Sequence, residues 1–486
     1  NQCVQSCPHA AIRAKQIEPE RLKDAPESFE VLKSISKNDR DLQFKIQVYT
    51  EDCQGCGVCI ETCPSKVKSL EFSPIQVERD AGEIANAEFF EELPYDILDG
   101  NALNSIKGLQ FKQPLFEFSG ACAGCGETPY VKMVSQICGE RMIVANATGC
   151  SSIYSGTFPT TPYTVRQSDG QGPAWGNSLF EDNAEYGLGM RLAVDANREQ
   201  LRIYIDKLFA LGTSAELKSA IEASLELWKE SSEEANDAQK AVKAALVKAI
   251  AAAKSDEERN LLAKIDELKD YFAEKVVFII GGDGWAYDIG FGGVDHVLAS
   301  GRNVNILVLD TEVYSNTGGQ ASKSTPIAAV AKFANAGMEI GKKNMGFMAM
   351  TYGHAYVASI SLGANRLHAQ RTLQEAVAFD GPSIVFAYST CINHGVNMRY
   401  SQEIMKDAVN SGYWPLYRYN PSLEEGKRFS WDVRSTKGSF QDFIRSEVRY
   451  SSLFKTNPAN AEELFARAEE DAKRRMDFYE KIGPLM

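Results

Sequence analysis

The sequence predicts an α/β protein in which a small, cysteine-rich α+β module precedes a domain built on a doubly wound parallel sheet. Two observations support this prediction. Ten of the eleven cysteines, all except Cys138, fall into three groups, and two of these groups lie within the first 75 residues. Farther along the chain, short apolar runs alternate with helical stretches, which is the pattern of parallel strands buried on both faces.

The second cysteine group has the spacing of ligands for iron–sulfur clusters. It runs Cys53-x2-Cys56-x2-Cys59-x3-Cys63 and is followed by Pro64. In such a run the first three thiolates bind one corner of a cubane, and the fourth reaches a neighbouring cluster. Zinc ribbons use paired C-x2-C knuckles, and disulfides are typical of small secreted chains, so both alternatives fit less well.

The first group, Cys3-x3-Cys7-Pro8, has the spacing of the second half of such a run. The sequence therefore predicts a bacterial-type 2[4Fe–4S] ferredoxin-like domain over residues 1–75. The two cysteines that would complete the first run precede Asn1, so we expect the sequence to be part of a longer polypeptide. The expected ligands are Cys7, Cys53, Cys56 and Cys59 on one cluster, and Cys3 and Cys63 on the other.

The composition argues against several classes of function. The 486 residues include 52 Lys and Arg against 65 Asp and Glu, a net charge of −13, whereas nucleic-acid binding needs basic faces. No apolar run approaches the roughly 20 residues of a membrane span, and no signal peptide opens the chain. With the cysteine motifs, this predicts a cytoplasmic protein of an anaerobe or facultative anaerobe. Cys138 has no spaced partner and is expected to be a small buried apolar residue.

The second domain is expected to span residues 114–486, after a connecting segment at 76–113 that shows little periodicity. Four of its apolar runs are expected to be strands, at 141–150, 275–284, 303–310 and 382–391.

Two stretches of the second domain predict charged helices. An Ala-, Glu- and Lys-rich stretch at 195–274 predicts an insertion of two or three helices with a solvated surface. Within it, Thr213-x-x-Glu216 and Ser255-x-x-Glu258 are candidate capping boxes. Residues 460–481 predict a further charged helix. The sequence assigns neither stretch a functional role.

Two loops of the second domain have the spacing of a diphosphate site. The expected strand at 276–280 leads into Gly282-Asp283-Gly284, and 26 residues separate Gly284 from Thr311, which follows the next strand. A glycine-rich loop there can wrap a diphosphate while its Asp binds Mg²⁺, and a side-chain oxygen and a carbonyl from the next loop can complete the site. This spacing matches the thiamine diphosphate (TPP) signature. The signature usually has Asn where Thr311 stands, and Thr still offers an oxygen ligand, although an isolated GDG triplet is often only a turn.

The third cysteine group is dispersed along the second domain. Cys122-x2-Cys125 lies in a glycine-rich turn, and Cys150 and Cys391 each end an expected strand, where the ligand crevice of a doubly wound sheet forms. Spacing alone leaves open a structural four-cysteine zinc site, or two unrelated buried cysteines beside a zinc knuckle. The neighbouring TPP loops and the ferredoxin-like domain favour a redox cluster.

Taken together, the motifs resemble the C-terminal half of the pyruvate:ferredoxin (flavodoxin) oxidoreductase family. They are SCPHAAIR, ACAGCGETPY, ATGCSSIYSG, GGDGWAYDIGFGG, DTEVYSNTGGQ and STCINHG, and with the cysteine runs they cover essentially the whole sequence. The resemblance implies a homodimer with three [4Fe–4S] clusters, TPP and Mg²⁺. It also implies conversion of pyruvate and coenzyme A to acetyl-CoA and CO2, with electrons passed to ferredoxin or flavodoxin. A relative acting on 2-oxoglutarate, a branched or an indolic 2-oxoacid stays open, as does a non-catalytic Fe–S electron-transfer subunit.

The resemblance also assigns residues. Mg²⁺ would be held by Asp283, Thr311 and the Val313 carbonyl, the third cluster by Cys122, Cys125, Cys150 and Cys391, and Asn316 would act nearest the substrate. The residues expected around TPP are Glu127, Cys150, Gly282, Asp283, Gly284, Trp285, Thr311, Glu312, Val313, Tyr314, Ser315 and Asn316. The family's glutamate that activates the aminopyrimidine, and its pyruvate-carboxylate ligands, lie in the N-terminal half. This chain is therefore expected to be inactive without that half.

Overall fold

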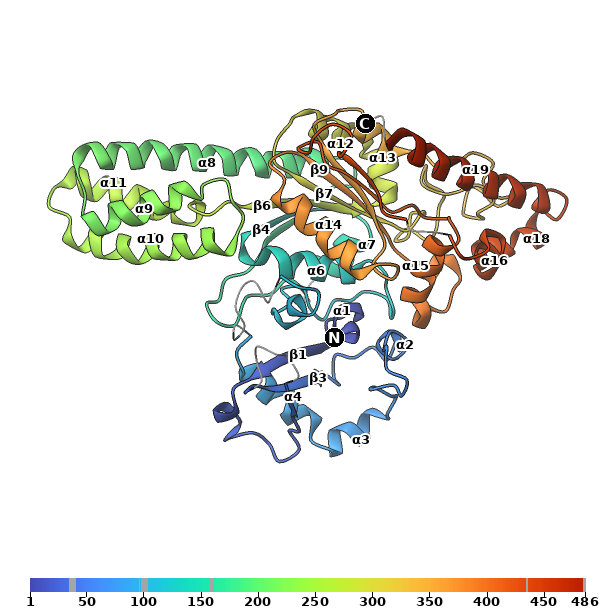
Figure 1. Cartoon of the computed structure of the whole chain (residues 1–486), viewed down its shortest axis with the longest axis horizontal. Coiled ribbons are helices and arrows are strands. Elements are labelled where there is room, and N and C mark those ends of the chain that lie inside the picture. Colours follow the sequence, from blue (N-terminus) through green and yellow to red (C-terminus); the bar gives the residue numbers. More distant parts are fainter. Residues whose placement is uncertain (35–40, 96, 98–103, 157–160, 434–435, 484–486) are drawn as a thin grey trace.

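The computed structural model describes residues 1–34, 41–95, 97, 104–156, 161–433 and 436–483. Figure 1 shows a small N-terminal domain below a large sheet domain, from which a long helical arm extends to one side. Among the described residues, no helix is both long and apolar enough to cross a membrane.

The N-terminal domain is a three-stranded antiparallel sheet covered by short helices. Its strands are β1 (Ile12–Ile17), β2 (Leu32–Lys33) and β3 (Gln43–Val48), in the order β1-β3-β2, with Ile12 opposite Val48. Its helices are α1 (Gln2–Ser6), α2 (Val58–Glu61), α3 (Ile75–Asp80) and α4 (Glu83–Glu92), with a 3-10 turn η1 (Pro19–Leu22). Cys3 lies within α1 and Cys59 within α2, and the other cysteines of the two runs come directly before or after these helices.

The segment 76–113, expected only to connect the two domains, contributes to the first one. It contains α4 and the 3-10 turn η2 (Gly108–Phe111), and Phe90 and Phe111 pack into the N-terminal core with Ile12. Because α4 buries only Asn86 and Phe90, its sequence shows little of the periodicity from which a packed helix is predicted.

The second domain is built on an eight-stranded sheet in the order β11-β10-β8-β9-β7-β6-β4-β5. The six strands from β8 to β5 are parallel, and β10 and β11 extend one edge antiparallel. The strands are β4 (Met142–Ala147), β5 (Ala174–Ser178), β6 (Val276–Gly282), β7 (Asn305–Asp310), β8 (Tyr356–Ile360), β9 (Ser383–Tyr388), β10 (Tyr417–Tyr419) and β11 (Phe429–Trp431). The four predicted strands are β4, β6, β7 and β9. They are neighbours in the sheet, in the order β9-β7-β6-β4.

Helices cover both faces of this sheet, which makes the predicted α/β class correct. In Figure 1, α6 and α14 lie together below the strands, whereas α12 lies above them with the first part of α8. The helices outside the arm are α6 (Thr128–Cys138), α7 (Cys150–Gly156), α12 (Phe291–Ala299), α13 (Met345–Met350), α14 (Arg366–Ala378), α15 (Ser401–Asn410), α16 (Phe440–Ser446), α17 (Val448–Ser451), α18 (Leu453–Thr456) and α19 (Ala461–Ile482). The last of these is the charged helix predicted at 460–481.

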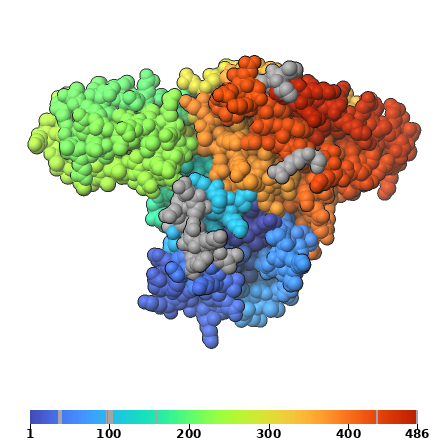
Figure 2. Space-filling view, in the orientation of Figure 1, coloured from blue at the N-terminus to red at the C-terminus, as the bar shows by residue number. Residues whose placement is uncertain are grey.

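The helical arm has more helices than predicted and starts earlier. It consists of α8 (Asn183–Leu211), α9 (Ala215–Glu226), α10 (Glu233–Ala252) and α11 (Asp256–Glu267), and Figure 2 shows it as a separate lobe. The boundary at 195 is wrong because α8 is continuous, and its first turns pack on the sheet through Gly187, which lies against Ile279. The arm has its own apolar core.

Of the two predicted capping boxes, one has the correct N-cap residue. The Ser255 hydroxyl accepts a hydrogen bond from the Glu258 amide at 3.1 Å, as a cap should. At α9, however, the cap is Ser214, whose hydroxyl accepts from the Leu217 amide, and not Thr213.

Candidate active site and iron–sulfur centres

The polar and cysteine residues of the second domain meet at the carboxyl edge of the sheet. Cys150 begins α7 directly after β4, Asp283 follows β6, Thr311 follows β7, and Cys391 follows β9. Because these strands are parallel neighbours, their carboxyl ends lie side by side, as ligand sites in such sheets require. Two adjoining cavities open at this edge, of about 210 Å³ and about 130 Å³.

Most of the residues expected around TPP line the larger of these two cavities. The cavity is lined by Glu127, Thr148, Gly149, Cys150, Ser151, Phe180, Gly282, Gly284, Trp285, Thr311, Val313, Tyr314, Ser315, Asn316 and Thr317. Two expected residues, Asp283 and Glu312, are instead buried behind its wall. Phe180 was missed because it follows β5, a strand that the sequence did not reveal.

Three oxygen groups converge beneath this cavity. The Asp283 Oδ1 atom accepts hydrogen bonds from the Thr311 amide at 3.2 Å and from its hydroxyl at 3.1 Å. The same hydroxyl lies 3.1 Å from the Val313 carbonyl oxygen. Burial, and then the neighbouring Asp310 carboxylate, raise the pKa of Asp283 well above its usual range. A cation here would stabilise the ionised carboxylate, so these oxygens suit a hard divalent metal.

The glycine that begins the turn after Asp283 allows two loops to approach each other closely. The π-turn η5 (Gly284–Ile289) starts here, and a Cβ atom on Gly284 would lie 2.6 Å from the Tyr314 ring. Only glycine fits against that ring. The GDG triplet is thus part of a packed junction between the loops after β6 and β7, not an isolated surface turn.

The third cysteine group surrounds the smaller cavity. Cys122, Cys125, Cys150 and Cys391 all line it, together with the apolar side chains of Ile153, Ile392 and Met398. A single zinc ion would draw its four sulfurs to within about 2.3 Å of one point. In the described part of the chain, no group of three or more His, Cys, Asp or Glu side chains is placed to hold a metal ion. The four cysteines that line this cavity are the set expected to hold the third cluster.

Glu127 lies on the wall between the two cavities. It lines both, as do Cys150, Thr311 and Asn316. The Glu127 side chain is buried, its Oε2 atom has no hydrogen-bond partner, and burial raises its pKa to about 7. A buried carboxyl oxygen without a partner is costly, so Glu127 is suited to meet a group bound in one of these cavities.

The cysteines of the N-terminal domain form two neighbouring sets. Burial, and then the sulfurs of Cys7, Cys56 and Cys53, raise the pKa of Cys59 to about 12. Burial also raises the pKa of Cys3, and the Cys63 sulfur adds to that effect. Cys63 is only partly exposed, and hydrogen bonds from Ser69 and Ser65 lower its pKa to about 7. The two sets thus differ little in burial: the first has Cys7 buried and Cys53 exposed, and in the second Cys3 and Cys63 are both intermediate.

A short turn, η7 (Met398–Tyr400), lies between the N-terminal cysteines and the third group. Met398 lines the smaller cavity and packs against Gly124, between Cys122 and Cys125. The next residue, Arg399, forms a hydrogen-bonded ion pair with Glu61 of α2 through its Nε atom at 2.6 Å. Two adjacent residues thus join the two cysteine centres.

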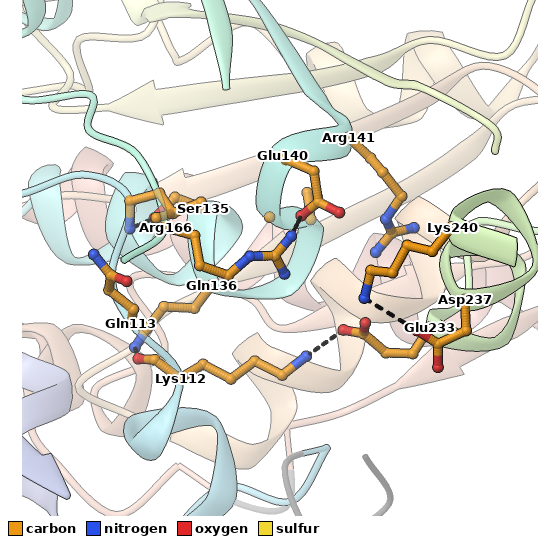
Figure 3. Close-up of a pocket in the computed structure, with 13 residues that line it drawn as sticks. Lys112, Gln113, Ser135, Gln136, Glu140, Arg141, Arg166, Glu233, Asp237 and Lys240 are labelled. Carbon is orange, nitrogen blue, oxygen red and sulfur yellow. Dashed lines mark hydrogen bonds and ion pairs between the residues drawn. The ribbon is translucent and has the colours of Figure 1, made fainter. Parts of the chain in front are cut away.

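A third cavity of about 300 Å³ lies at the root of the helical arm, away from these centres. Figure 3 shows that its charged side chains face one another in pairs. The Lys112 ammonium lies 2.8 Å from Glu233, Arg166 lies 2.9 Å from Glu140, and the Lys240 ammonium lies 3.1 Å from Asp237. Of these three pairs, Lys112–Glu233 joins α10 to the segment that precedes the sheet domain, whereas Lys240–Asp237 lies within α10. Cys138 lies here as a buried residue, in agreement with its predicted packing role.

Comparisons with known proteins agree with this two-domain arrangement. Residues 1–67 match the family model of the 4Fe-4S dicluster domain, and residues 261–387 match that of the C-terminal TPP-binding domain of thiamine pyrophosphate enzymes. The predicted ferredoxin-like and TPP-binding domains, with their Fe–S and TPP cofactors, are thereby confirmed.

Similar curated proteins match nearly the whole chain. It is 53% identical to a pyruvate:ferredoxin oxidoreductase of Moorella thermoacetica, over 99% of this chain and 41% of that protein. Identity is 48% to a pyruvate-flavodoxin oxidoreductase of Nostoc and 46% to one of Klebsiella pneumoniae, over 99% of this chain and 40% of each. The chain thus spans about two fifths of the length of these relatives. A solved 2-oxoglutarate:ferredoxin oxidoreductase from Magnetococcus marinus, with a TM-score of 0.35 and 16% identity over 57% of this chain and 65% of that chain, is too weak a match for any argument.

Proposed function

Because this chain corresponds to the C-terminal portion of pyruvate:ferredoxin and pyruvate-flavodoxin oxidoreductases, we propose that the complete polypeptide oxidises pyruvate with coenzyme A to acetyl-CoA and CO2. Ferredoxin or flavodoxin receives the electrons. The observation that carries the proposal is the pair of adjoining cavities, one suited to TPP and one ringed by four cysteines, with Glu127 and Cys150 in their shared wall.

In this proposal the chain holds TPP by its diphosphate. Asp283, Thr311 and the Val313 carbonyl bind Mg²⁺, and the backbone from Gly282 to Trp285 surrounds the diphosphate. TPP supplies a nucleophilic carbon and an electron sink when it is bound. Asn316, which lines both cavities, lies nearest the substrate and orients it. The apolar Phe180 and Tyr314 side chains restrict water at the reacting end.

Cys122, Cys125, Cys150 and Cys391 hold a third [4Fe–4S] cluster, which accepts electrons one at a time. From there, electrons pass to the cluster held by Cys7, Cys53, Cys56 and Cys59, and then to the one that includes Cys3 and Cys63. The contact of Met398 with Gly124, and of Arg399 with Glu61, supports the first transfer. The partial exposure of Cys63 supports the last, because an external carrier must reach that cluster.

The rim of the smaller cavity supports a larger assembly. Ile153 and Ile392 line this cavity yet are 52% and 55% exposed. Exposed apolar side chains at the mouth of a site are typical of surfaces that another segment covers. We therefore assign the cover to the N-terminal portion of the same polypeptide, within a cytoplasmic homodimer.

The test is steady-state activity of the complete polypeptide. We expect reduction of a low-potential dye that requires both pyruvate and coenzyme A, and no turnover by the present 486-residue chain alone. Pyruvate, 2-oxoglutarate and a branched 2-oxoacid should be compared at equal concentration. A higher kcat/KM for either of the other two would overturn the assignment of pyruvate.

A further inference from the structure

A buried lysine of the sheet domain is directed at the N-terminal cysteines. Lys132 lies on α6 and is 3% exposed. Its ammonium group donates hydrogen bonds to the carbonyl oxygens of Val4 and Cys7, the latter at 3.1 Å. No carboxylate among the described residues forms an ion pair with it, although both domains are rich in acids.

A second cation of the sheet domain lies near α1, the helix that contains Val4 and ends just before Cys7. Arg366 begins α14, which packs beside α6, and one of its terminal nitrogens lies 3.4 Å from the Ser6 hydroxyl of α1. Its Nε atom is buried and has no hydrogen-bond partner. Within the described chain Arg366 also lacks an ion-pair partner.

Two buried cations of the N-terminal domain differ in their partners: Lys15 donates hydrogen bonds to the Phe90 and Leu93 carbonyls and has no ion pair among the described residues, whereas Arg13 is ion-paired. The Arg13 guanidinium is as deeply buried, and it forms ion pairs with Glu91, at 3.1 Å, and with Glu117. An isolated buried ion is strongly disfavoured, whereas a paired one is not. A negative group other than an amino-acid carboxylate would therefore stabilise the charge of the buried Lys132 and of the partly buried Arg366.

A [4Fe–4S] cluster with four thiolate ligands carries a net negative charge, and that charge increases by one on reduction. We propose that Lys132, assisted by Arg366, is the counter-charge of the cluster held by Cys7, Cys53, Cys56 and Cys59, and that it raises the reduction potential of this cluster. A nearby cation stabilises the reduced form more than the oxidised form. Lys132 thus favours electron transfer onto this cluster. The inference rests on the proposed cluster assignment, but not on the identity of the oxoacid.

The test is an EPR-monitored redox titration of the complete, cluster-loaded polypeptide. Lys132→Met keeps the length and apolar stem of the side chain but removes the charge. We expect the equilibrium constant for reducing one cluster to fall about tenfold, which is 59 mV for a one-electron couple. Lys132→Arg retains the charge and should keep the potential near that of the wild type. Lys229→Met is the control, since Lys229 is exposed and pairs with Asp380.

Arg366→Gln provides an independent variant, and it should shift the same cluster in the same direction by about threefold. If Lys132→Met retains its iron and shows the wild-type potential, the proposal is overturned and Lys132 only joins the domains. If Lys132→Met loses its clusters, the decision rests on Arg366→Gln. A wild-type reduction potential in Arg366→Gln would then overturn the proposal. Failure of the proposed function would appear separately, as absent pyruvate oxidation with unchanged potentials in the wild-type protein.

Discussion

At the scale of single residues, the loop after β7, which carries the proposed Mg²⁺ ligands Thr311 and Val313, is held in position by charges outside the larger cavity. Glu312 has a left-handed backbone conformation, with φ of 62°, which is unfavourable for a residue with a Cβ atom. Its carboxylate lies 3.0 Å from both the Lys342 ammonium and the Arg449 guanidinium. Glu312 was expected beside TPP, but it is a buried anchor that fixes Thr311 and Val313 on either side.

The first prediction concerns Asp283. Asp283→Ala removes the one carboxylate among the three proposed metal-ligand groups, so Mg²⁺-dependent TPP binding should be lost by isothermal titration calorimetry. Iron content should stay at the wild-type level because no cysteine is affected. Asp295→Ala, at an exposed acid of α12, is the control. Unchanged TPP affinity in Asp283→Ala would show that the GDG segment is only a turn.

A second prediction concerns Arg449, one of the two cations that contact the Glu312 carboxylate. Arg449→Met leaves the Glu312 and Glu447 carboxylates buried with one cation fewer, which should lower the free energy of unfolding by about 3 kcal/mol. TPP affinity should fall as well, because the left-handed conformation at Glu312 loses support. Arg445→Met, which removes a partly exposed pair with Glu462, should leave both quantities nearly unchanged. Equal denaturation midpoints for the two variants would contradict this prediction.

At the scale of elements, the short 3-10 turn η6 (Ile392–His394) connects Cys391 of the third cysteine group to the loop after β7 through a hydrogen bond. His394 follows Cys391 by three residues, and its Nε2–H group donates a hydrogen bond to the Thr311 carbonyl at 2.8 Å. Burial, and then the Arg449 charge, lower the pKa of His394 to about 3. The ring is therefore neutral at pH 7, and Nε2 carries the proton.

The pH dependence of stability gives a third prediction. Between pH 6.5 and about 3 the unfolded chain protonates this histidine while the folded chain does not. Stability should therefore fall as the pH falls, by up to about 1.4 kcal/mol per pH unit from this group. His394→Gln should show a shallower loss between pH 6.5 and 5 in chemical denaturation. Parallel curves for the variant and the wild type would refute the assignment.

How far the elements could be predicted depended on how they are buried. Strands β6, β7 and β9 are buried along almost their whole length, so a continuous apolar run revealed them. Strand β5 is a half-exposed edge strand with the sequence AWGNS, and β10 and β11 have three residues each, too few for a pattern. The motif residues of the site were predicted because ligand chemistry restricts their identity. Phe180 and the anchors Lys342 and Arg449 were not, because their roles depend on tertiary contacts.

At the scale of the whole molecule, Cys391 and the proposed Mg²⁺ ligands lie on different segments of the chain. Cys391 is the ligand farthest in sequence from the rest of its group, and none of the proposed Mg²⁺ ligands lies on its segment. Cys391→Ser should therefore destabilise or retune the third cluster, because an alkoxide is a harder and poorer ligand for iron. TPP and Mg²⁺ binding should persist.

The measurement for this fourth prediction is pre-steady-state CO2 release compared with the EPR signal of the reduced N-terminal clusters, in the complete polypeptide. CO2 release should continue while reduction of those clusters slows sharply. Wild-type reduction rates in Cys391→Ser would exclude the route through the third cluster.

The contacts between the two domains have a consequence for how electrons travel. The Phe118 amide donates a hydrogen bond to the His9 carbonyl at 2.8 Å, and His9 Nδ1 lies 3.1 Å from the Ser119 carbonyl. With the Lys132 and Arg399 contacts, these hydrogen bonds join the small domain to the sheet domain at several points. The small domain cannot behave as a swinging carrier that alternates between donor and acceptor. In the proposed function the domain therefore transfers electrons from a fixed position, so the internal transfer rate should be insensitive to solvent viscosity, and only the final exchange with an outside carrier should depend on diffusion.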